Sequence, residues 1–169
     1  MTELEQIKQD YVGQWGALGS QWGINRTMAM IHAHLLVSPS SQTTDDVMDA
    51  LSISRGNANT NLRELVSWGL IRNVVMRGER KDYYEAEKDV WKIFCIVARE
   101  RKRRETEPAS LVLQDCITRS KSIKSTEGKE LHKQLTSLNE FVTLANNIME
   151  KVATKGDSSI IPKILKVLS

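Results

Sequence analysis

A cluster of amide, hydroxyl and guanidinium side chains between residues 54 and 67 (SRGNANTNLRELVS) has the types that hydrogen bond to nucleic-acid bases. Arginine can bond a guanine edge through two hydrogen bonds, asparagine can bond an adenine edge, and threonine can contact a thymine methyl group. Asparagine is a poor helix former, so three asparagines within five positions are not explained by helix propensity. The segment is a candidate surface for reading DNA.

Helical spacing would separate this segment into two faces. At about 100° per residue, Ala58, Leu62 and Leu65 lie on one side, which predicts the face that packs on a core. The other side and its flanks carry Gly56 and the polar residues Asn57, Asn59, Thr60, Arg63 and Ser67, with Arg55 near the beginning of the helix. The simpler interpretation is a solvated helix face, but such faces are usually filled with Glu, Lys and Gln. Contact with another protein is a further alternative.

The elements on either side position this helix. Residues 43–46 (TTDD) have the pattern of a helix N-cap with an acidic first turn, which predicts a short helix over 44–51. Ser52 and Ile53 form a tight turn, Ser54 caps the next helix, and Gly69 ends it. Two short helices joined by a tight turn predict a helix-turn-helix.

The sequence after Gly69 predicts a β-hairpin. In LIRNVVMRGERKDYYEAE, β-branched and aromatic residues flank a glycine-containing turn at residues 77–80. Arg77, Arg80 and Lys81 place three cations at the tip, where they could lie along the minor groove or against phosphates. An ordinary charged turn is the alternative. The predicted fold class is mainly α (α+β): a winged helix-turn-helix over residues 24–88, with a small β-hairpin wing and long flanking dimerisation helices.

The distribution of charge supports nucleic acid as a partner. Residues 52–81 contain six basic and two acidic side chains, whereas the whole chain has a formal net charge of only +3. A local positive region on a nearly neutral protein is typical of a module that contacts phosphates.

The flanking segments predict dimerisation. Residues 1–23 form an N-terminal helix with an apolar stripe, and residues 89–169 form a helical region that Pro108 interrupts. Within that region, residues 131–152 carry a seam with the 3.5-residue spacing of a coiled coil. The seam is formed by Leu131, Leu135, Leu138, Val142, Ala145, Met149 and Val152, widened by Phe141, Leu144 and Ile148. The apolar tail IIPKILKVL is expected to dock on a helical partner. We favour packing between subunits, because a small winged domain leaves little core for these helices, although packing within one subunit remains the alternative.

Several stretches resemble the GbsR-type branch of the MarR-like regulators: residues 54–65, Trp68 to Arg72, Gly78 to Glu87, Trp91, and the GINR stretch at 23–26. The resemblance covers residues 15–104 and fades beyond them. It implies a homodimeric DNA-binding transcriptional regulator, usually a repressor, on a pseudo-palindromic operator in double-stranded DNA. It also implies that the residues facing the major groove are Ser54, Arg55, Asn57, Asn59, Thr60 and Arg63, with Arg77, Arg80 and Lys81 in the wing.

A small-molecule effector is a second hypothesis. Tyr11, Trp15, Trp22 and Trp91 could line a pocket whose aromatic faces attract a quaternary ammonium group. Tryptophans at helical spacing more often form part of a core, which is the alternative.

Other classes are disfavoured. The three histidines lack metal-ligand spacing, and the sequence contains no phosphate-binding glycine loop or hydrolase motif, so neither an enzyme nor a metal or cofactor is expected. No apolar run approaches the ~20 residues that span a bilayer, and the N-terminus does not resemble a signal peptide, so a cytoplasmic location is expected. The remaining alternative is a winged helix that serves protein–protein interaction in a larger assembly. Steep salt dependence would distinguish DNA binding from it.

Overall fold

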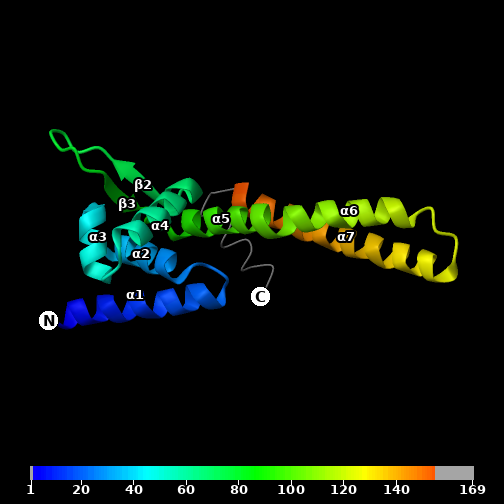
Figure 1. Ribbon diagram of the computed structural model, residues 1–169, viewed down its shortest axis with the longest axis horizontal. Coiled ribbons are helices and arrows are strands. Elements are labelled where there is room, and N and C mark those ends of the chain that lie inside the picture. Colours follow the sequence, from blue (N-terminus) through cyan, green and yellow to red (C-terminus); the bar gives the residue numbers. More distant parts are fainter. Residues whose placement is uncertain (1, 155–169) are drawn as a thin grey trace. The chain divides into compact units, whose positions relative to one another are not determined.

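The computed structural model describes residues 2–154. These residues divide into two compact units. The first ends at Ile93 and the second begins at Phe94. The first unit contains α1 (Glu3–Gln21), α2 (Arg26–Val37), β1 (Gln42–Thr43), α3 (Thr44–Leu51), α4 (Arg55–Trp68), β2 (Ile71–Val74) and β3 (Tyr83–Ala86). Helix α5 (Val90–Arg101) spans the boundary, and the second unit continues with a π-helical turn (Lys102–Thr106), α6 (Glu107–Ser120) and α7 (Thr126–Thr154) (Figure 1).

The core of the first unit lies between α2, α3 and α4. Ile31 and Leu35 of α2, Val47 of α3 and Leu62 of α4 are fully buried. Removing a leucine-sized side chain from water contributes about 1.5–3 kcal/mol. The predicted helix-turn-helix is therefore held by its apolar faces, and the polar residues of α4 lie outside the core, except for Asn61, which is buried.

The ends of α3 and α4 follow from local chemistry. Thr43 and Asp46 form a reciprocal capping box at the beginning of α3. Ser52, in the tight turn, adopts a left-handed conformation with φ 53°. Gly69 ends α4 with φ 82°, a conformation that costs glycine little because it has no Cβ.

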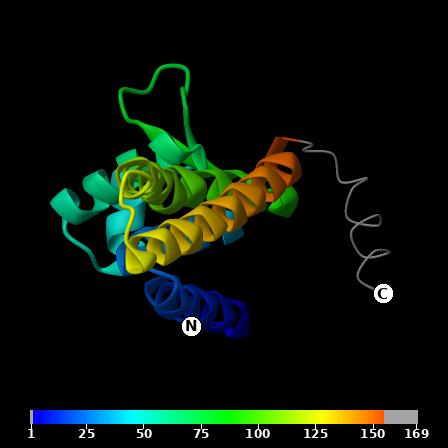
Figure 2. The same ribbon diagram turned by 90° about the vertical axis from the view of Figure 1, so that its right-hand side faces the viewer.

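The wing belongs to a three-stranded antiparallel sheet with strand order β1-β3-β2. Ile71 pairs with Ala86, and Val74 pairs with Tyr83. On the other side of β3, Thr43 also pairs with Tyr83. The sequence predicted the hairpin but not β1, because a strand of two residues leaves no periodicity. The loop between β2 and β3 extends away from the helices of the first unit in both ribbon views (Figures 1 and 2).

Helix α1 packs on α2 through glycines. A Cβ at Gly16 would lie 2.5 Å from Met30 Cγ, and one at Gly19 would lie 2.5 Å from Ala29 Cβ. The two helix backbones can approach closely only because both positions lack a side chain. The predicted apolar stripe, by contrast, is largely exposed at Leu4, Ile7 and Leu18.

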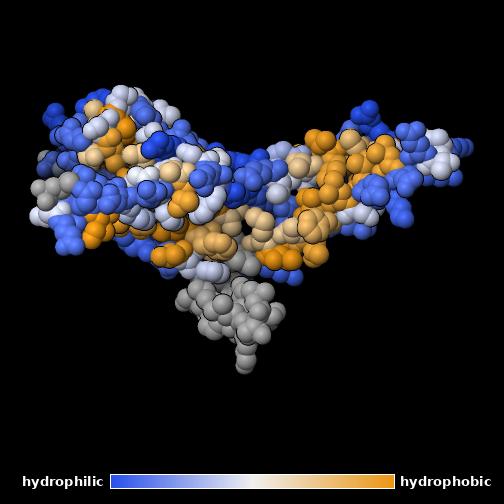
Figure 3. Space-filling model, turned by 90° about the horizontal axis from the view of Figure 1, so that it is seen from below, coloured by the Kyte–Doolittle hydropathy of each residue, from blue (hydrophilic) through white to orange (hydrophobic). Residues whose placement is uncertain are grey.

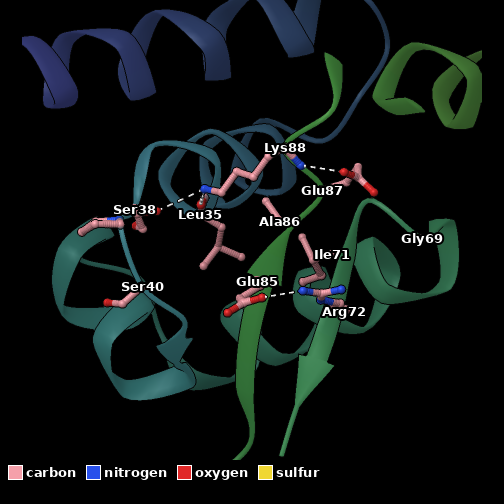
Figure 4. Close-up of a pocket in the computed structure, with 11 residues that line it drawn as sticks. Leu35, Ser38, Ser40, Gly69, Ile71, Arg72, Glu85, Ala86, Glu87 and Lys88 are labelled. Atoms are coloured by element: carbon pink, nitrogen blue, oxygen red, sulfur yellow. Dashed lines mark hydrogen bonds and ion pairs between the residues drawn. The ribbon is translucent and has the colours of Figure 1, made fainter. Parts of the chain in front are cut away.

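Lys88 ties the end of the wing to the end of α2. Its Nζ atom donates hydrogen bonds to the backbone oxygens of Leu35, Leu36 and Ser38, at 2.9, 2.5 and 3.1 Å (Figure 4). A cation is well placed at a helix C-terminus, where carbonyl groups lack partners within the helix. Burial lowers the pKa of Lys88. Burial also lowers the pKa of His32 from 6.5 to about 4, with a further contribution from the charge of Lys88.

The second unit corrects the expectation about Pro108. The helical path is not broken at the proline, because a π-helical turn over Lys102–Thr106 precedes it. The Glu107 N–H donates to the Lys102 carbonyl five residues earlier, and Pro108 then lies in the first turn of α6. Proline is tolerated there because the first turn needs no N–H donor.

Helix α7 packs against α6 to form a helical hairpin (Figures 1 and 2). The predicted seam is divided between two faces of α7. Leu135, Val142 and Met149 are half-buried, while Leu131 and Leu138 are about half exposed. The last seam residue, Val152, has no described side chain, and the apolar tail IIPKILKVL lies outside the described residues.

We predict opposite effects for two glycine substitutions in α1. Gly19→Ala should lower the free energy of unfolding by about 1–3 kcal/mol, because the new methyl group would overlap Ala29. Gly13→Ala should raise it by about 0.5–1 kcal/mol, because no atom lies within 4 Å of the added Cβ and alanine favours a helix. Urea unfolding of both variants measures these changes in the free energy of unfolding. Equal changes in the two variants would contradict the close contact at Gly19.

We also predict that stability depends on the protonation of His32. Its pKa of about 4 lies below the value of 6.5 expected in the unfolded chain, so the unfolded chain takes up the proton first as the pH falls. The stabilisation is fully present above about pH 6.5 and is lost toward about pH 4, about 3 kcal/mol in total.

Denaturant unfolding at several pH values should show this loss in the wild-type chain and a smaller loss in His32→Leu. His132→Gln, in the second unit, is the control and should keep the full dependence. A His32→Leu variant with the wild-type pH dependence would show that another group is responsible.

Candidate nucleic-acid interface

The inner face of α4 decides which of its residues are exposed. Ala58 and Leu62 have no exposed surface, and Leu65 is 1% exposed. The Ser54 hydroxyl caps the helix by accepting the Asn57 N–H at 3.3 Å. With this face packed and the first turn capped, the opposite side of α4 is exposed.

The structure exposes most of the predicted groove-facing residues. Ser54, Arg55, Asn57, Thr60 and Arg63 are exposed, and Asn59 is half-buried. Within residues 2–154, no ion pair is formed by Arg63. Its five N–H donors are therefore available for a partner such as a guanine edge.

Two of the three asparagines hydrogen bond to each other. Asn61 is buried, and its Nδ2 donates to the Asn57 carbonyl oxygen at 2.9 Å and to the Asn57 Oδ1 at 2.7 Å. Asn57 Nδ2 donates in turn to Thr27 Oγ1 of α2 at 3.3 Å. Asn57 thus links α4 to α2, and one Nδ2 hydrogen is left for an additional contact.

An acidic residue of α3 connects the two parts of the predicted interface. The Asp45 carboxylate forms one ion pair with Arg55 of α4 and another with Lys81 of the wing, the latter at 3.5 Å. The Arg55 guanidinium, and then Lys81, lower the pKa of Asp45. Arg55 and Lys81 therefore meet at one carboxylate.

The loop of the wing presents cations together with two exposed apolar side chains, Val75 and Met76. Arg77 and Arg80 are exposed, and Gly78 has φ 88°, which glycine adopts without strain. Val75, near the beginning of the loop, is 94% exposed. A cationic, projecting loop of this kind can approach a groove or a phosphate backbone.

A cavity of about 290 Å³ lies at the base of the wing (Figure 4). Its apolar side chains come from Leu35, Pro39, Ile71 and Ala86. Its charged residues already have partners: Arg72 pairs with Glu85 at 2.9 Å, and Lys88 bonds the α2 carbonyls. The polar groups of this cavity therefore connect the wing to the helices, and the cavity does not have the character of a polar ligand site.

Three of the four predicted effector residues lie in a row on α1 and just after it. The ring centroids of Tyr11 and Trp15 are 5.7 Å apart, and those of Trp15 and Trp22 are 6.2 Å apart. Trp91 is half-buried in α5. None of the four lines the cavity at the base of the wing.

Within residues 2–154, no group of three His, Cys, Asp or Glu side chains is placed to hold a metal ion. None of the helices in that range is both long enough and apolar enough to cross a membrane.

Sequence reasoning missed Asp45, Asn61 and Thr27 as parts of this interface. The sequence around Asp45 indicates only an acidic first helical turn, and the side-chain partners of Asn61 and Thr27 come from different turns or helices. Nothing in the local sequence indicates these contacts.

Comparison with known proteins finds helix-turn-helix regulators. None of the protein-family models matches the chain. It is 24% identical to the HTH-type transcriptional repressor GbsR of Bacillus subtilis (strain 168), over 94% of this chain and 93% of that protein. It is 29% identical over 76 residues to the HTH-type transcriptional regulator MmpR5 of Mycobacterium tuberculosis (strain ATCC 25618 / H37Rv). That second match spans 44% of this chain and about half of MmpR5, 46% of its length.

A solved structure of a transcriptional regulator has the same fold. It superimposes with a TM-score of 0.56 at 22% identity, over 85% of this chain and 98% of that one. These likenesses confirm the winged-helix fold class and the resemblance to GbsR-type helix-turn-helix regulators. The relatives are regulators and not enzymes, in agreement with the sequence prediction.

Proposed function

We propose that this protein is a sequence-specific transcriptional regulator that binds double-stranded DNA as a homodimer and acts as a cytoplasmic repressor. The main support is the exposed face of α4, where Thr60 and Arg63 stand opposite a fully packed apolar face. The projecting cationic wing supplies a second contact. The repressor role is suggested by GbsR, a transcriptional repressor by name.

In this proposal, α4 enters the major groove and the wing contacts the neighbouring backbone or minor groove. Arg63 reads a base, because its guanidinium is exposed and unpaired within the described residues. Asn59 and Thr60 contribute polar contacts beside it. Arg77 and Arg80 supply charge, which strengthens binding to every sequence alike.

A second copy of the chain would cover the apolar surface of the α6–α7 hairpin. Outward-facing apolar residues of α7 are strongly exposed: Leu138 50%, Phe141 67%, Leu144 58% and Ile148 54%. The space-filling view shows hydrophobic surface gathered over this hairpin (Figure 3). An apolar band this continuous is unusual on the surface of a monomer and typical of a protein interface.

The same helix has a second face with a different composition. Leu135, Val142 and Met149 face inward together with Asn139 and Asn146, so α7 already packs within its own unit. The two alternatives left open by the sequence are therefore compatible, since one face serves the hairpin and the other is available to a partner. The stripe of Leu4, Ile7 and Leu18 on α1 offers a further contact of the same kind.

For the effector we propose only a chemical class. A cation with apolar substituents fits the row formed by Tyr11, Trp15 and Trp22, because aromatic faces attract such groups.

Arg63→Ala tests the base-reading role. Fragments selected from a random duplex pool by the wild-type protein should be bound about 10–100-fold more weakly by the variant, with lost preference at one base position per half-site. Arg80→Ala should weaken all duplexes alike. The matched control is Arg119→Ala, which removes an exposed arginine from α6.

If Arg63→Ala selects the same sequences with the same affinity as the wild type, the assignment of α4 as the recognition helix is wrong. If the wild-type protein binds no duplex with a steep salt dependence, the protein-interaction alternative is favoured.

Phe141→Glu together with Leu144→Glu tests the dimer. Two buried carboxylates in an apolar interface cannot be paired, so the molar mass measured by light scattering should fall from that of a dimer to that of a monomer. Thr143→Glu adds the same side chain at an exposed position of α7 outside the apolar band, and it should leave the dimer intact. A dimeric double variant would contradict this interface.

A further inference from the structure

One carboxylate joins two elements that are far apart in sequence. Asp45 lies in the first turn of α3, Arg55 is the first residue of α4, and Lys81 follows the wing tip. One oxygen of Asp45 accepts from Arg55 and the other from Lys81. Arg55 and Lys81 are exposed and the Asp45 side chain is 43% exposed, so this is a surface arrangement and not part of the core.

The chemistry of this arrangement matches that of a phosphate site. An arginine and a lysine that converge on one anionic group form a typical phosphate-binding pair. In the free protein the anionic group is the carboxylate of Asp45. Asp45 remains ionised there, since both cations lower its pKa.

We propose that Arg55 and Lys81 together bind one DNA backbone phosphate, shared between the recognition helix and the wing, and that Asp45 occupies its place in the free protein. This inference rests on the proposed function and deepens it. It changes the role of Arg55, which contacts the backbone and does not read a base. On binding, the two cations exchange the carboxylate for a phosphate oxygen.

The exchange makes Asp45 an internal competitor. Each exposed ion pair is weak, so the exchange is easily reversed. The freed carboxylate then remains close to the phosphates, where its negative charge opposes binding. Because the backbone is the same at every base pair, this opposition acts on all sequences alike.

The test uses the full-length chain and duplex titrations at several salt concentrations. Asp45→Asn should bind operator and random duplex about three- to tenfold more tightly, with a steeper salt dependence. Asp49→Asn is the matched control, because Asp49 is exposed on the same helix and, within residues 2–154, forms no ion pair. It should change the affinity much less. Thermal unfolding should show both variants folded.

Arg55→Ala and Lys81→Ala complete the test. Each should weaken binding to all duplexes and reduce the salt slope by about one, and the double variant should lose less than the two single losses combined. The base preferences of the selected fragments should stay unchanged.

Three results would overturn the inference while leaving DNA binding intact. These are a changed base preference in Arg55→Ala, equal effects of Asp45→Asn and Asp49→Asn, or weaker binding by Asp45→Asn. Absence of duplex binding by the wild-type protein would instead refute the proposed function itself.

Discussion

The packing of α4 on the core of the first unit is the contact from which the other features follow. Ala58, Leu62 and Leu65 form a narrow apolar face, and their burial fixes the rotation of the helix about its own axis. A rotation by one residue would bury polar groups without partners, which is costly. The exposed positions of Thr60 and Arg63 are thus set by residues that never contact a partner.

Polar contacts refine this position. The hydrogen bonds from Asn61 to Asn57 and from Asn57 to Thr27 hold the beginning of α4 against α2. Satisfied polar groups near a core specify one arrangement more sharply than apolar packing does. Lys88 has a similar effect at the base of the wing, where it bonds three carbonyl groups at the end of α2. The wing and the helices are therefore joined by directional bonds as well as by apolar contacts.

The sequence was sufficient to predict the elements with strong local signals. Capping residues, Gly69 and the apolar spacing of α4 predicted the helix-turn-helix, and the turn around Gly78 predicted the hairpin. The sequence was insufficient where a feature depends on partners distant along the chain. β1 exists because two residues reach the edge of β3, and the ion pairs of Asp45 join residues up to 36 positions apart. The seam of α7 was recognised as one surface, but its residues are divided between two faces, because spacing alone does not tell which side meets α6.

Pro108 is a second case in which the local sequence does not determine the structure. A proline inside a helical pattern predicts a break, yet a single π-helical turn changes the hydrogen-bond pairing before the ring is reached. The local rule was correct that regular pairing cannot continue. Which accommodation the chain adopts depends on the packing of the helices around it, here on the contact of this segment with α7.

The glycine contact between α1 and α2 has a geometric consequence for any assembly built on α1. Both helices belong to the unit that carries α4, and at Gly19 the backbone of α1 packs directly on the Ala29 methyl group of α2. The distance between the exposed apolar stripe of α1 and the exposed face of α4 is therefore fixed by this packing. In a symmetric pair joined along that stripe, twice this distance would contribute to the separation of the two reading helices. The spacing between half-sites that such a dimer fits would then depend partly on glycine, and not alanine, at position 19.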